Sequence, residues 1–205
     1  MIRPIIRLRT QGDRKLVETQ TLTIEELEKD IDAKKKQLAE LRRAQPRAAV
    51  QDFTFDSPQG AVRLSELFDG RKDLLIIHNM GEACRYCMLW ADGLNGVLPH
   101  LQNRTAVVMV NPDPVDQQQR FAKSRGWNYR IVRDATGDFS KAMGMHGEEP
   151  GSFWPGATGL TMSESGTIER VASAPFGEGD DFCATWHLLD LLADGWNKWE
   201  PQYKY

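Results

Sequence analysis

The sequence predicts an α/β domain in which helices flank a central mixed β-sheet, preceded by an N-terminal helical extension. Two continuous apolar runs of strand length, 73–79 and 105–110, enclose a helical pattern and indicate a β-α-β unit. Two further strand-like segments, 158–162 and 167–172, flank a turn at 163–166 as an antiparallel hairpin. Parallel and antiparallel strands in one domain predict a mixed sheet.

The composition limits the class of protein. The chain has 205 residues, 40% of them hydrophobic, which is enough for one sizeable core. No apolar run approaches the roughly 18 residues that a membrane span needs, and arginines interrupt the N-terminal segment before a signal-peptide core can form. We therefore expect a cytoplasmic protein. The formal net charge of -3, without a basic stripe, argues against nucleic-acid binding, so proteins and small molecules are the expected partners.

The chain is predicted to divide into an N-terminal part, residues 1–46, and a main α/β domain, residues 47–205. Residues 1–20 are mixed and charged and show no sustained hydrophobic period. We expect an arm of low order there, followed by one helix.

This helix has a clear start, a narrow apolar stripe and a clear stop. Thr23 and Glu26 have the spacing of a capping box, and Pro46 prevents continuation. Lys34 fills one place in an apolar heptad pattern that consists of Ile24, Leu27, Ile31, Leu38 and Leu41. We expect the stripe to pack against its own domain, with pairing to a second subunit, a homodimer, as the alternative.

The main domain is predicted to begin with a hairpin and a short helix. Residues alternate in polarity around Phe53 and Phe55, turn at 57–60 and resume at 61–63, which is the pattern of two antiparallel strands. A short helix at 64–68 then leads into the first apolar run.

After the β-α-β unit, helical and strand patterns alternate again. Gly126 marks the end of one helix, and Asp180 and Asp181 are the expected caps of the last one. The predicted elements are a helix at 115–125, a strand at 129–132, a helical turn at 141–145, the hairpin and a helix at 182–192.

Two of the three cysteines, Cys84 and Cys87, lie where the first apolar run gives way to a helix. A thiol in the first turn of a helix meets unpaired backbone N–H groups and the positive end of the helix dipole, which favour the thiolate. Arg85 adds a positive charge, and both effects lower the pKa of a cysteine. One helical turn separates the two cysteines, so they share a face and can form a short disulfide. The spacing thus supplies an attacking and a resolving thiol.

Two other interpretations of this pair stay open. Free cysteines are often buried apolar side chains without chemistry. A zinc site would need four nitrogen or sulfur ligands, or three with a water, and His78, Cys183 and His187 are the candidates to complete one. Placement between a strand and a helix favours redox chemistry over both interpretations.

Neighbouring side chains are candidates for supporting roles. His78, at the strand end, is a candidate general acid or base, although a structural histidine is favoured. Asp92 is a candidate proton acceptor for Cys87, although a solvated surface acid is favoured because the helix turns it only partly toward the thiol. Tyr86 is expected to cap the site. Cys183 is expected to lie in the core.

The segment QDFTFDSPQGAVRLSELFDGRKDLLIIHNM resembles the opening of peroxiredoxins and their thioredoxin-fold relatives, in which a hairpin and a short helix precede the strand that delivers the reactive cysteine. From residue 23 to about residue 145, the chain resembles more closely the bacterial thioredoxin-like family filed as domain of unknown function 899. The stretch CMLWADGLNGVLPHL is the most specific part of this resemblance. EGDDFCATWHLLDLL and WEPQYKY resemble the tail of one branch of the family.

The resemblance implies a thioredoxin-like fold and a dithiol site at Cys84 and Cys87. Peroxiredoxins carry a Pro-x-x-x-Thr-x-x-Cys signature, and with Cys87 at its cysteine, Met80 stands at the proline and Cys84 at the threonine. Thioredoxins carry Trp-Cys-Gly-Pro-Cys, whereas Cys-x-Tyr-Cys is closer to glutaredoxins. Thioredoxins also place a cis-proline ahead of the third core strand, where Thr158 is expected here.

The sequence therefore predicts a thiol-disulfide oxidoreductase in which Cys84 attacks a disulfide of a protein or small molecule and Cys87 resolves the mixed disulfide. One alternative is a peroxiredoxin-like thiol peroxidase that uses the same pair. The other is a non-catalytic binding or assembly module, with the helix at 23–43 and the aromatic tail as contact surfaces. No cofactor is expected, because Gly177 and Gly179 lack the third glycine of a nucleotide-binding motif.

Overall fold

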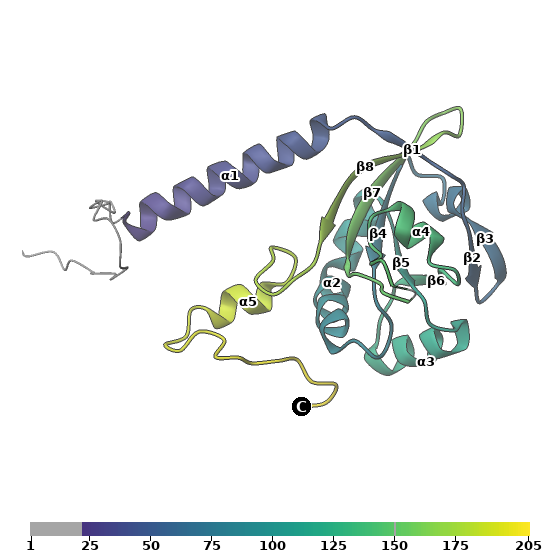
Figure 1. Cartoon of the computed structure of the whole chain (residues 1–205). Helices are drawn as coiled ribbons and strands as arrows, with labels where there is room; N and C mark the ends of the chain where they lie inside the picture. The colour runs from purple at the N-terminus through teal and green to yellow at the C-terminus, as the bar shows by residue number, and fades with distance from the viewer. Residues whose placement is uncertain (1–21, 150) are drawn as a thin grey trace, which may run out of the picture. The chain divides into compact units, whose positions relative to one another are not determined.

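Eight strands form one sheet in this computed structural model, which describes residues 22–149 and 151–205 (Figure 1). They are β1 (Ala48–Val50), β2 (Thr54–Ser57), β3 (Gly60–Arg63), β4 (Asp73–His78), β5 (Ala106–Asn111), β6 (Arg130–Arg133), β7 (Gly156–Met162) and β8 (Ile168–Pro175). The strand order is β1-β8-β7-β4-β5-β6-β2-β3. β4, β5 and β6 are parallel and the other pairings are antiparallel, so the predicted mixed sheet is confirmed.

The two apolar runs of the sequence form the centre of this sheet. β4 and β5 pair from Leu74 opposite Ala106 to His78 opposite Val110. Every residue of β5 is buried, as expected of a parallel strand that is covered on both faces. Because parallel strands end at the same edge of a sheet, the segments that follow β4 and β5 are brought together there.

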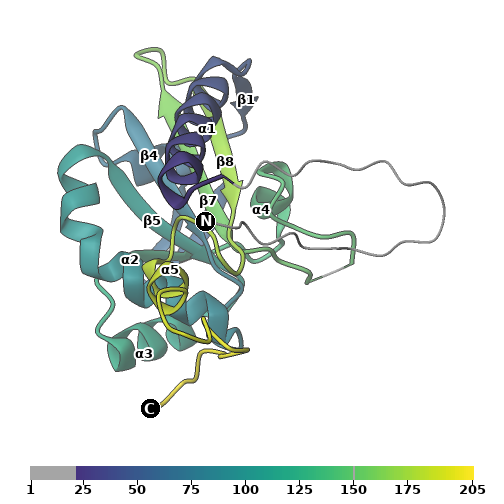
Figure 2. The same cartoon turned by 90° about the vertical axis from the view of Figure 1, so that its left-hand side faces the viewer.

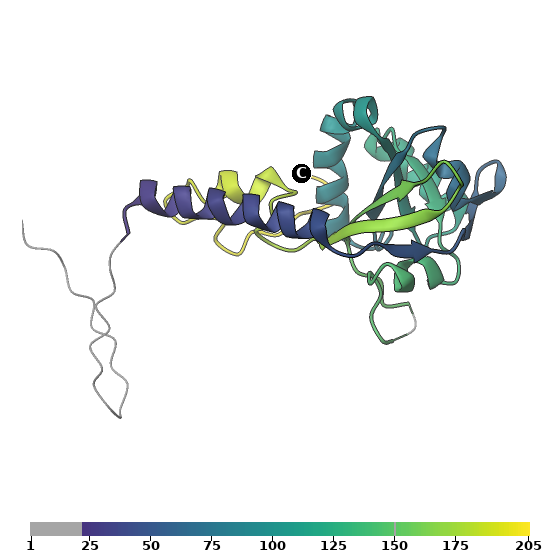
Figure 3. The ribbon, with the colours of Figure 1, turned by 90° about the horizontal axis from the view of Figure 1, so that it is seen from above.

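Helices cover both faces of the sheet. They are η1 (Leu64–Phe68, a 3-10 helix), α2 (Arg85–Arg104), α3 (Val115–Arg125), α4 (Asp138–Ala142) and α5 (Ala184–Leu189). α2 and α3 lie on one face, and α4 lies on the other (Figure 2, Figure 3). Two buried clusters fill the layers, one around Phe55, Leu67 and Phe139, the other around Trp90 and Trp186. Each helix of the described residues is too short or too polar to cross a lipid bilayer.

Several elements differ from the prediction, among them β1, α4 and α5. β1 has only three residues, too few for a recognisable alternation, and is defined by its pairing with β8. α4 begins earlier than the predicted turn. α5 is shorter than the predicted helix, and its N-cap is Cys183 rather than Asp180 or Asp181. The Asp180 carboxylate closes a turn instead, because it accepts hydrogen bonds from the N–H groups of Gly177 at 2.8 Å and Phe182 at 2.7 Å.

The chain divides into two compact units between Glu40 and Leu41, near the predicted domain boundary. The predicted arm at residues 1–20 lies outside the described residues. The first unit is therefore described through its helix alone.

This helix, α1 (Ile24–Ala44), begins with the predicted capping box. The Glu26 carboxylate accepts a hydrogen bond from the Thr23 N–H at 2.8 Å, and the Thr23 hydroxyl oxygen accepts one from the Glu26 N–H at 3.2 Å. No residue of α1 is buried. Packing of its apolar stripe against its own domain stays a prediction.

We expect Phe139→Ala to lower the free energy of unfolding by about 3 to 5 kcal/mol, because it removes a large buried ring. Phe139 is 1% exposed, and its ring centroid lies 5.5 Å from that of Phe53, 5.0 Å from Phe55 and 5.7 Å from His78. Urea denaturation measures the effect. Leu191→Ala, at a side chain that is 81% exposed, is the control and should change stability by less than about 0.5 kcal/mol. Equal effects of the two changes would contradict this packing.

Candidate active site

Cys84 and Cys87 lie at the start of α2, beyond the carboxyl end of β4. Cys84 is the N-cap residue of α2, with an extended backbone. Its Sγ accepts a hydrogen bond from the N–H of Cys87 at 3.1 Å. An N-cap side chain that accepts from the third helical N–H satisfies one of the donors that every helix start leaves unpaired. The helix therefore begins at Arg85, one residue after the first thiol.

The two thiols differ in access to solvent. Cys84 is partly exposed, whereas Cys87 is 2% exposed. The Cys87 Sγ accepts a hydrogen bond from the N–H of Met80 at 3.3 Å, in the loop that precedes the helix. A reactant from solution therefore reaches Cys84 first, and Cys87 lies behind it.

The pair also differs in acidity. A hydrogen bond from the Cys87 thiol is the main cause that lowers the pKa of Cys84 to about 7, and the N–H groups of Cys87 and Tyr86 add to it while burial opposes it. The pKa of Cys87 is raised, because its thiol donates to Cys84 and because it is buried. As Cys84 ionises around pH 7, the pair comes to share one proton, with the negative charge on the outer sulfur.

A tight loop holds the motif against the sheet. The Asn79 side-chain oxygen accepts a hydrogen bond from the Gly81 N–H at 2.8 Å, and the Asp113 carboxylate accepts one from the Glu82 N–H at 2.7 Å. Gly81 has φ 98, a backbone conformation that favours glycine. A Cβ at Gly81 would lie 2.6 Å from the Asp113 Oδ1. Asp113 thus positions the segment that leads into Cys84.

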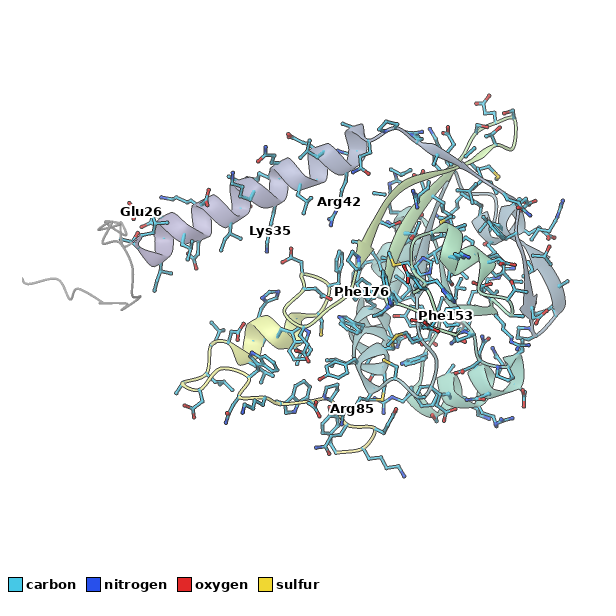
Figure 4. The ribbon with its side chains drawn as sticks, in the orientation of Figure 1. Glu26, Lys35, Arg42, Arg85, Phe153 and Phe176 are labelled. Atoms are coloured by element: carbon cyan, nitrogen blue, oxygen red, sulfur yellow. The ribbon has the colours of Figure 1, made fainter. Side chains whose placement is uncertain are left out.

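The C-terminal segment lies along the outer side of the motif (Figure 4). Glu200 forms an ion pair with Arg85, and the Tyr86 hydroxyl donates to the Glu200 carboxylate at 3.5 Å. The Tyr203 hydroxyl donates to the carbonyl of Ala83 at 2.7 Å. The Arg85 guanidinium is therefore paired with Glu200, and it is not among the groups that shift the pKa of Cys84.

Asp113, Glu200 and Tyr203 are absent from the sequence prediction. Asp113 carried a usable signal, because it follows β5 and so lies at the same sheet edge as the motif. Glu200 and Tyr203 carried none, since each lies more than a hundred residues from its partner and no local pattern joins them.

Asp92 is engaged away from the thiols. Its carboxylate forms an ion pair with Arg125 and accepts a hydrogen bond from the Trp127 Nε1–H at 2.7 Å. Its candidate role as a proton acceptor for Cys87 is not supported by these contacts. Asp92 instead links α2 to α3 and the segment that follows it.

His78 is buried below the motif. Its ring stacks on Phe139, and its Nε2 lies 2.9 Å from the Thr158 Oγ1. Burial lowers the pKa of His78 to about 3, so the ring is neutral at physiological pH. Among the hydrogen bonds of the described residues, none joins His78 to Cys84 or Cys87. These contacts favour the structural interpretation of this histidine.

Thr158 does not occupy the position that the sequence predicted for it. It is the third residue of β7, fully buried, and it pairs with Ile76 of β4. Pro155 is the residue ahead of β7, and the chain has no cis peptide bond in its described residues. The expectation failed because β7 begins at Gly156, a residue that strand patterns rarely include. The Thr158 hydroxyl instead bridges His78 and Ser173, 2.9 Å from each.

Cys183 lies in the core, as expected. It is 4% exposed and belongs to the cluster that contains Trp186. His187, the other residue considered for zinc on this segment, lies with its Nε2 3.0 Å from the carbonyl of Asp180. Within residues 22–149 and 151–205, no group of three or more His, Cys, Asp or Glu side chains could hold a metal ion.

Residues 13–205 match the family described as "Bacterial protein of unknown function (DUF899)". The chain belongs to this family. No curated protein matches the chain.

Solved structures similar to this DUF899 protein include peroxiredoxins. Reduced Prx3 in complex with H2O2 from Vibrio vulnificus has a TM-score of 0.50 and 11% identity, over 66% of this chain and 87% of that chain. Peroxidoxin BcpB from Mycobacterium tuberculosis has a TM-score of 0.49 and 20% identity, over 63% and 84%. The predicted thioredoxin-like fold is confirmed.

In this DUF899 protein, we expect alkylation of Cys84 by iodoacetamide to accelerate with pH and to reach half of its maximal rate near pH 7, because the thiolate reacts and its pKa is about 7. Cys87→Ala removes the main hydrogen-bond donor, so the midpoint should move to higher pH. Peptide mapping by mass spectrometry follows the rate. Cys183→Ala is the control and should not move the midpoint. A wild-type midpoint near about 8.5, the ordinary value, would contradict the shared proton.

We expect Gly81→Ala to destabilise the protein more than Gly70→Ala does. Both positions have positive φ, 98 and 72, so each change costs about 1 to 2 kcal/mol of backbone strain. Only at Gly81 does the new Cβ meet the Asp113 carboxylate, whereas no atom lies within 4 Å at Gly70. Urea midpoints of the two variants give the difference, which should shrink when Asp113 is also replaced by alanine. Equal midpoints for the two variants would show that Asp113 does not press on the loop.

Proposed function

We propose that the protein is a thiol-disulfide oxidoreductase in which Cys84 attacks and Cys87 resolves. One observation carries the proposal: the accessible N-cap sulfur accepts the hydrogen bonds that stabilise a thiolate, and the thiol that donates to it is buried behind it. The thioredoxin-like fold is consistent with this chemistry. The reducing cytoplasm is the compartment in which we expect it to work.

In the first step, the Cys84 thiolate attacks one sulfur of the partner's disulfide. A new S–S bond forms between Cys84 and that sulfur, the partner's own S–S bond breaks, and the other partner sulfur leaves as a thiolate that takes a proton from water. The stable thiolate at Cys84 supplies the nucleophile without a separate base, which agrees with the buried, neutral state of His78.

The second step begins when the charge on Cys84 has gone. The hydrogen bond to the Cys84 thiolate is the main cause that raises the pKa of Cys87, and the mixed disulfide removes it. The Met80 N–H then stabilises the Cys87 thiolate, which attacks the Cys84 sulfur. The partner sulfur that was bound to Cys84 leaves as a thiolate and takes a proton from water, which replaces the proton that Cys87 released, and the protein carries a Cys84–Cys87 disulfide. An external dithiol returns this disulfide to the reduced pair.

The thiol peroxidase is the second candidate function, and the likeness to Prx3 in complex with H2O2 favours it. Here the Cys84 thiolate would attack the peroxide, releasing water or an alcohol and leaving a sulfenic acid, which Cys87 would convert to the same disulfide with loss of water. Peroxide consumption with a dithiol donor, compared with reduction of a disulfide by the same donor, separates the two functions. The binding-module hypothesis predicts that a double Cys84→Ala, Cys87→Ala variant keeps full function.

We expect Cys84 and Cys87 to interconvert between dithiol and disulfide in glutathione buffers, at a potential between roughly −270 and −120 mV. Alkylation followed by intact mass and peptide mapping counts the thiols. Cys84→Ser should abolish turnover, while Cys87→Ser should trap partners as mixed disulfides on Cys84. The Cys183→Ser variant is the control and should keep the potential, because Cys183 lies outside the motif. Two free thiols under oxidising buffers would refute the proposal.

A further inference from the structure

The apolar stripe of α1 is exposed along the whole helix. The exposed fractions are 80% for Ile24, 47% for Leu27, 45% for Ile31, 47% for Leu38 and 58% for Leu41. Helices in proteins gain most of their stability from packing of such an amphipathic face. A 21-residue helix with no buried residue therefore needs a partner surface for its stripe.

The spacing of the stripe indicates another helix as this partner. With Lys34, its members recur at alternating steps of three and four over three heptads, which places Ile24, Ile31 and Leu38 at a positions and Leu27, Lys34 and Leu41 at d positions. A repeat of seven residues keeps the seam aligned with a second helix that winds around it, whereas burial in a globular core follows the period of 3.6 and a broader face.

The charges of α1 are divided along its length. The first half holds most of the acids, Glu25, Glu26, Glu28, Asp30 and Asp32, and the second half holds most of the bases, Lys34, Lys35, Lys36, Arg42 and Arg43. Figure 4 shows Glu26 near one end, with Lys35 and Arg42 farther along and pointing to the same side. The ion pairs Lys29–Glu25 and Lys36–Asp32, both 2.7 Å, occupy the face opposite the seam. They leave the seam itself free for a partner.

We propose that α1 pairs with α1 of a second copy of this chain as an antiparallel two-stranded coiled coil. Running the second helix in the opposite direction sets the acidic half of each copy against the basic half of the other. It also places each residue at heptad position a opposite a residue at heptad position d. Ile24 meets the partner's Leu41, and Leu27 meets the partner's Leu38. The inference does not depend on the chemistry of the cysteines.

Lys34 selects this direction over the parallel one. In a parallel pair, Lys34 of each copy would face the other inside the seam, where two like charges repel. In the antiparallel pair, Lys34 lies opposite the partner's Ile31, which its aliphatic stem can cover while the ammonium group reaches water. At the flanks, Glu28 lies opposite the partner's Lys35, which adds an attractive contact on each side.

The first test is the mass of the full-length protein under reducing conditions, measured by sedimentation equilibrium over a wide concentration series. We expect a dimer that Leu38→Glu weakens by about 100-fold or more, because each copy then sets a charge in the apolar seam. Ala33→Glu is the matched control: it adds the same charge at an exposed position of α1 outside the seam and should keep the dimer. A wild-type monomer at every concentration, or a dimer that Leu38→Glu leaves intact, would overturn the proposal and return the stripe to its own domain or to another partner.

The second test fixes the direction by exchange of charges. Glu28→Lys and Lys35→Glu should each weaken the antiparallel dimer, and the double variant should restore it because the pair is reformed with reversed sign. A parallel dimer would instead bring Asp30 beside the partner's Lys35, so Asp30→Lys with Lys35→Glu would be the restoring combination. Recovery with that combination alone would overturn the antiparallel arrangement.

Discussion

The parallel pairing of β4 with β5 determines the position of everything that surrounds the two cysteines. The ladder continues past the strands, because the Asn79 N–H donates to the carbonyl of Val110 at 3.0 Å. The segments that follow β4 and β5 then leave the sheet at one edge. The loop after β4 contains Gly81, and the loop after β5 contains Asp113. Their contact sets the path into α2, and so it places Cys84 at the helix N-terminus. A shift of register by one residue would separate these two loops and move each side chain of β4 to the other face of the sheet.

The unequal acidity of the two thiols follows from hydrogen bonding rather than from a neighbouring charged side chain. The helix start supplies backbone donors, and the inner thiol supplies one more, so the outer sulfur gains a negative charge and the inner sulfur keeps the proton. Nearby charged side chains have other partners: Arg85 is paired with Glu200, and Asp92 with Arg125. The acidity of Cys84 therefore depends on the geometry of the first turn of α2, and the sheet determines where that turn lies.

Local patterns in the sequence predicted the elements whose structure depends on residues close together in the chain. Continuous apolar runs gave β4 and β5, a capping box gave the start of α1, and the cysteine spacing placed the motif between strand and helix. What failed depends on distant partners or on competing local bonds. Asp180 engages its carboxylate in a turn and so does not cap α5, and the contacts of Glu200 and Tyr203 join segments that only the folded chain brings together.

The aromatic residues around the last helix couple tryptophan fluorescence to the structure of the cysteine motif. Tyr86, between the two cysteines, stacks on Trp186 with 6.3 Å between ring centroids, and Trp186 in turn contacts Trp196 at 5.6 Å and Trp199 at 5.8 Å. Any movement of the first turn of α2 changes the surroundings of these indoles, whose emission depends on their contacts. The chain therefore carries an intrinsic fluorescent reporter beside its cysteines, and the state of the motif becomes visible without a label.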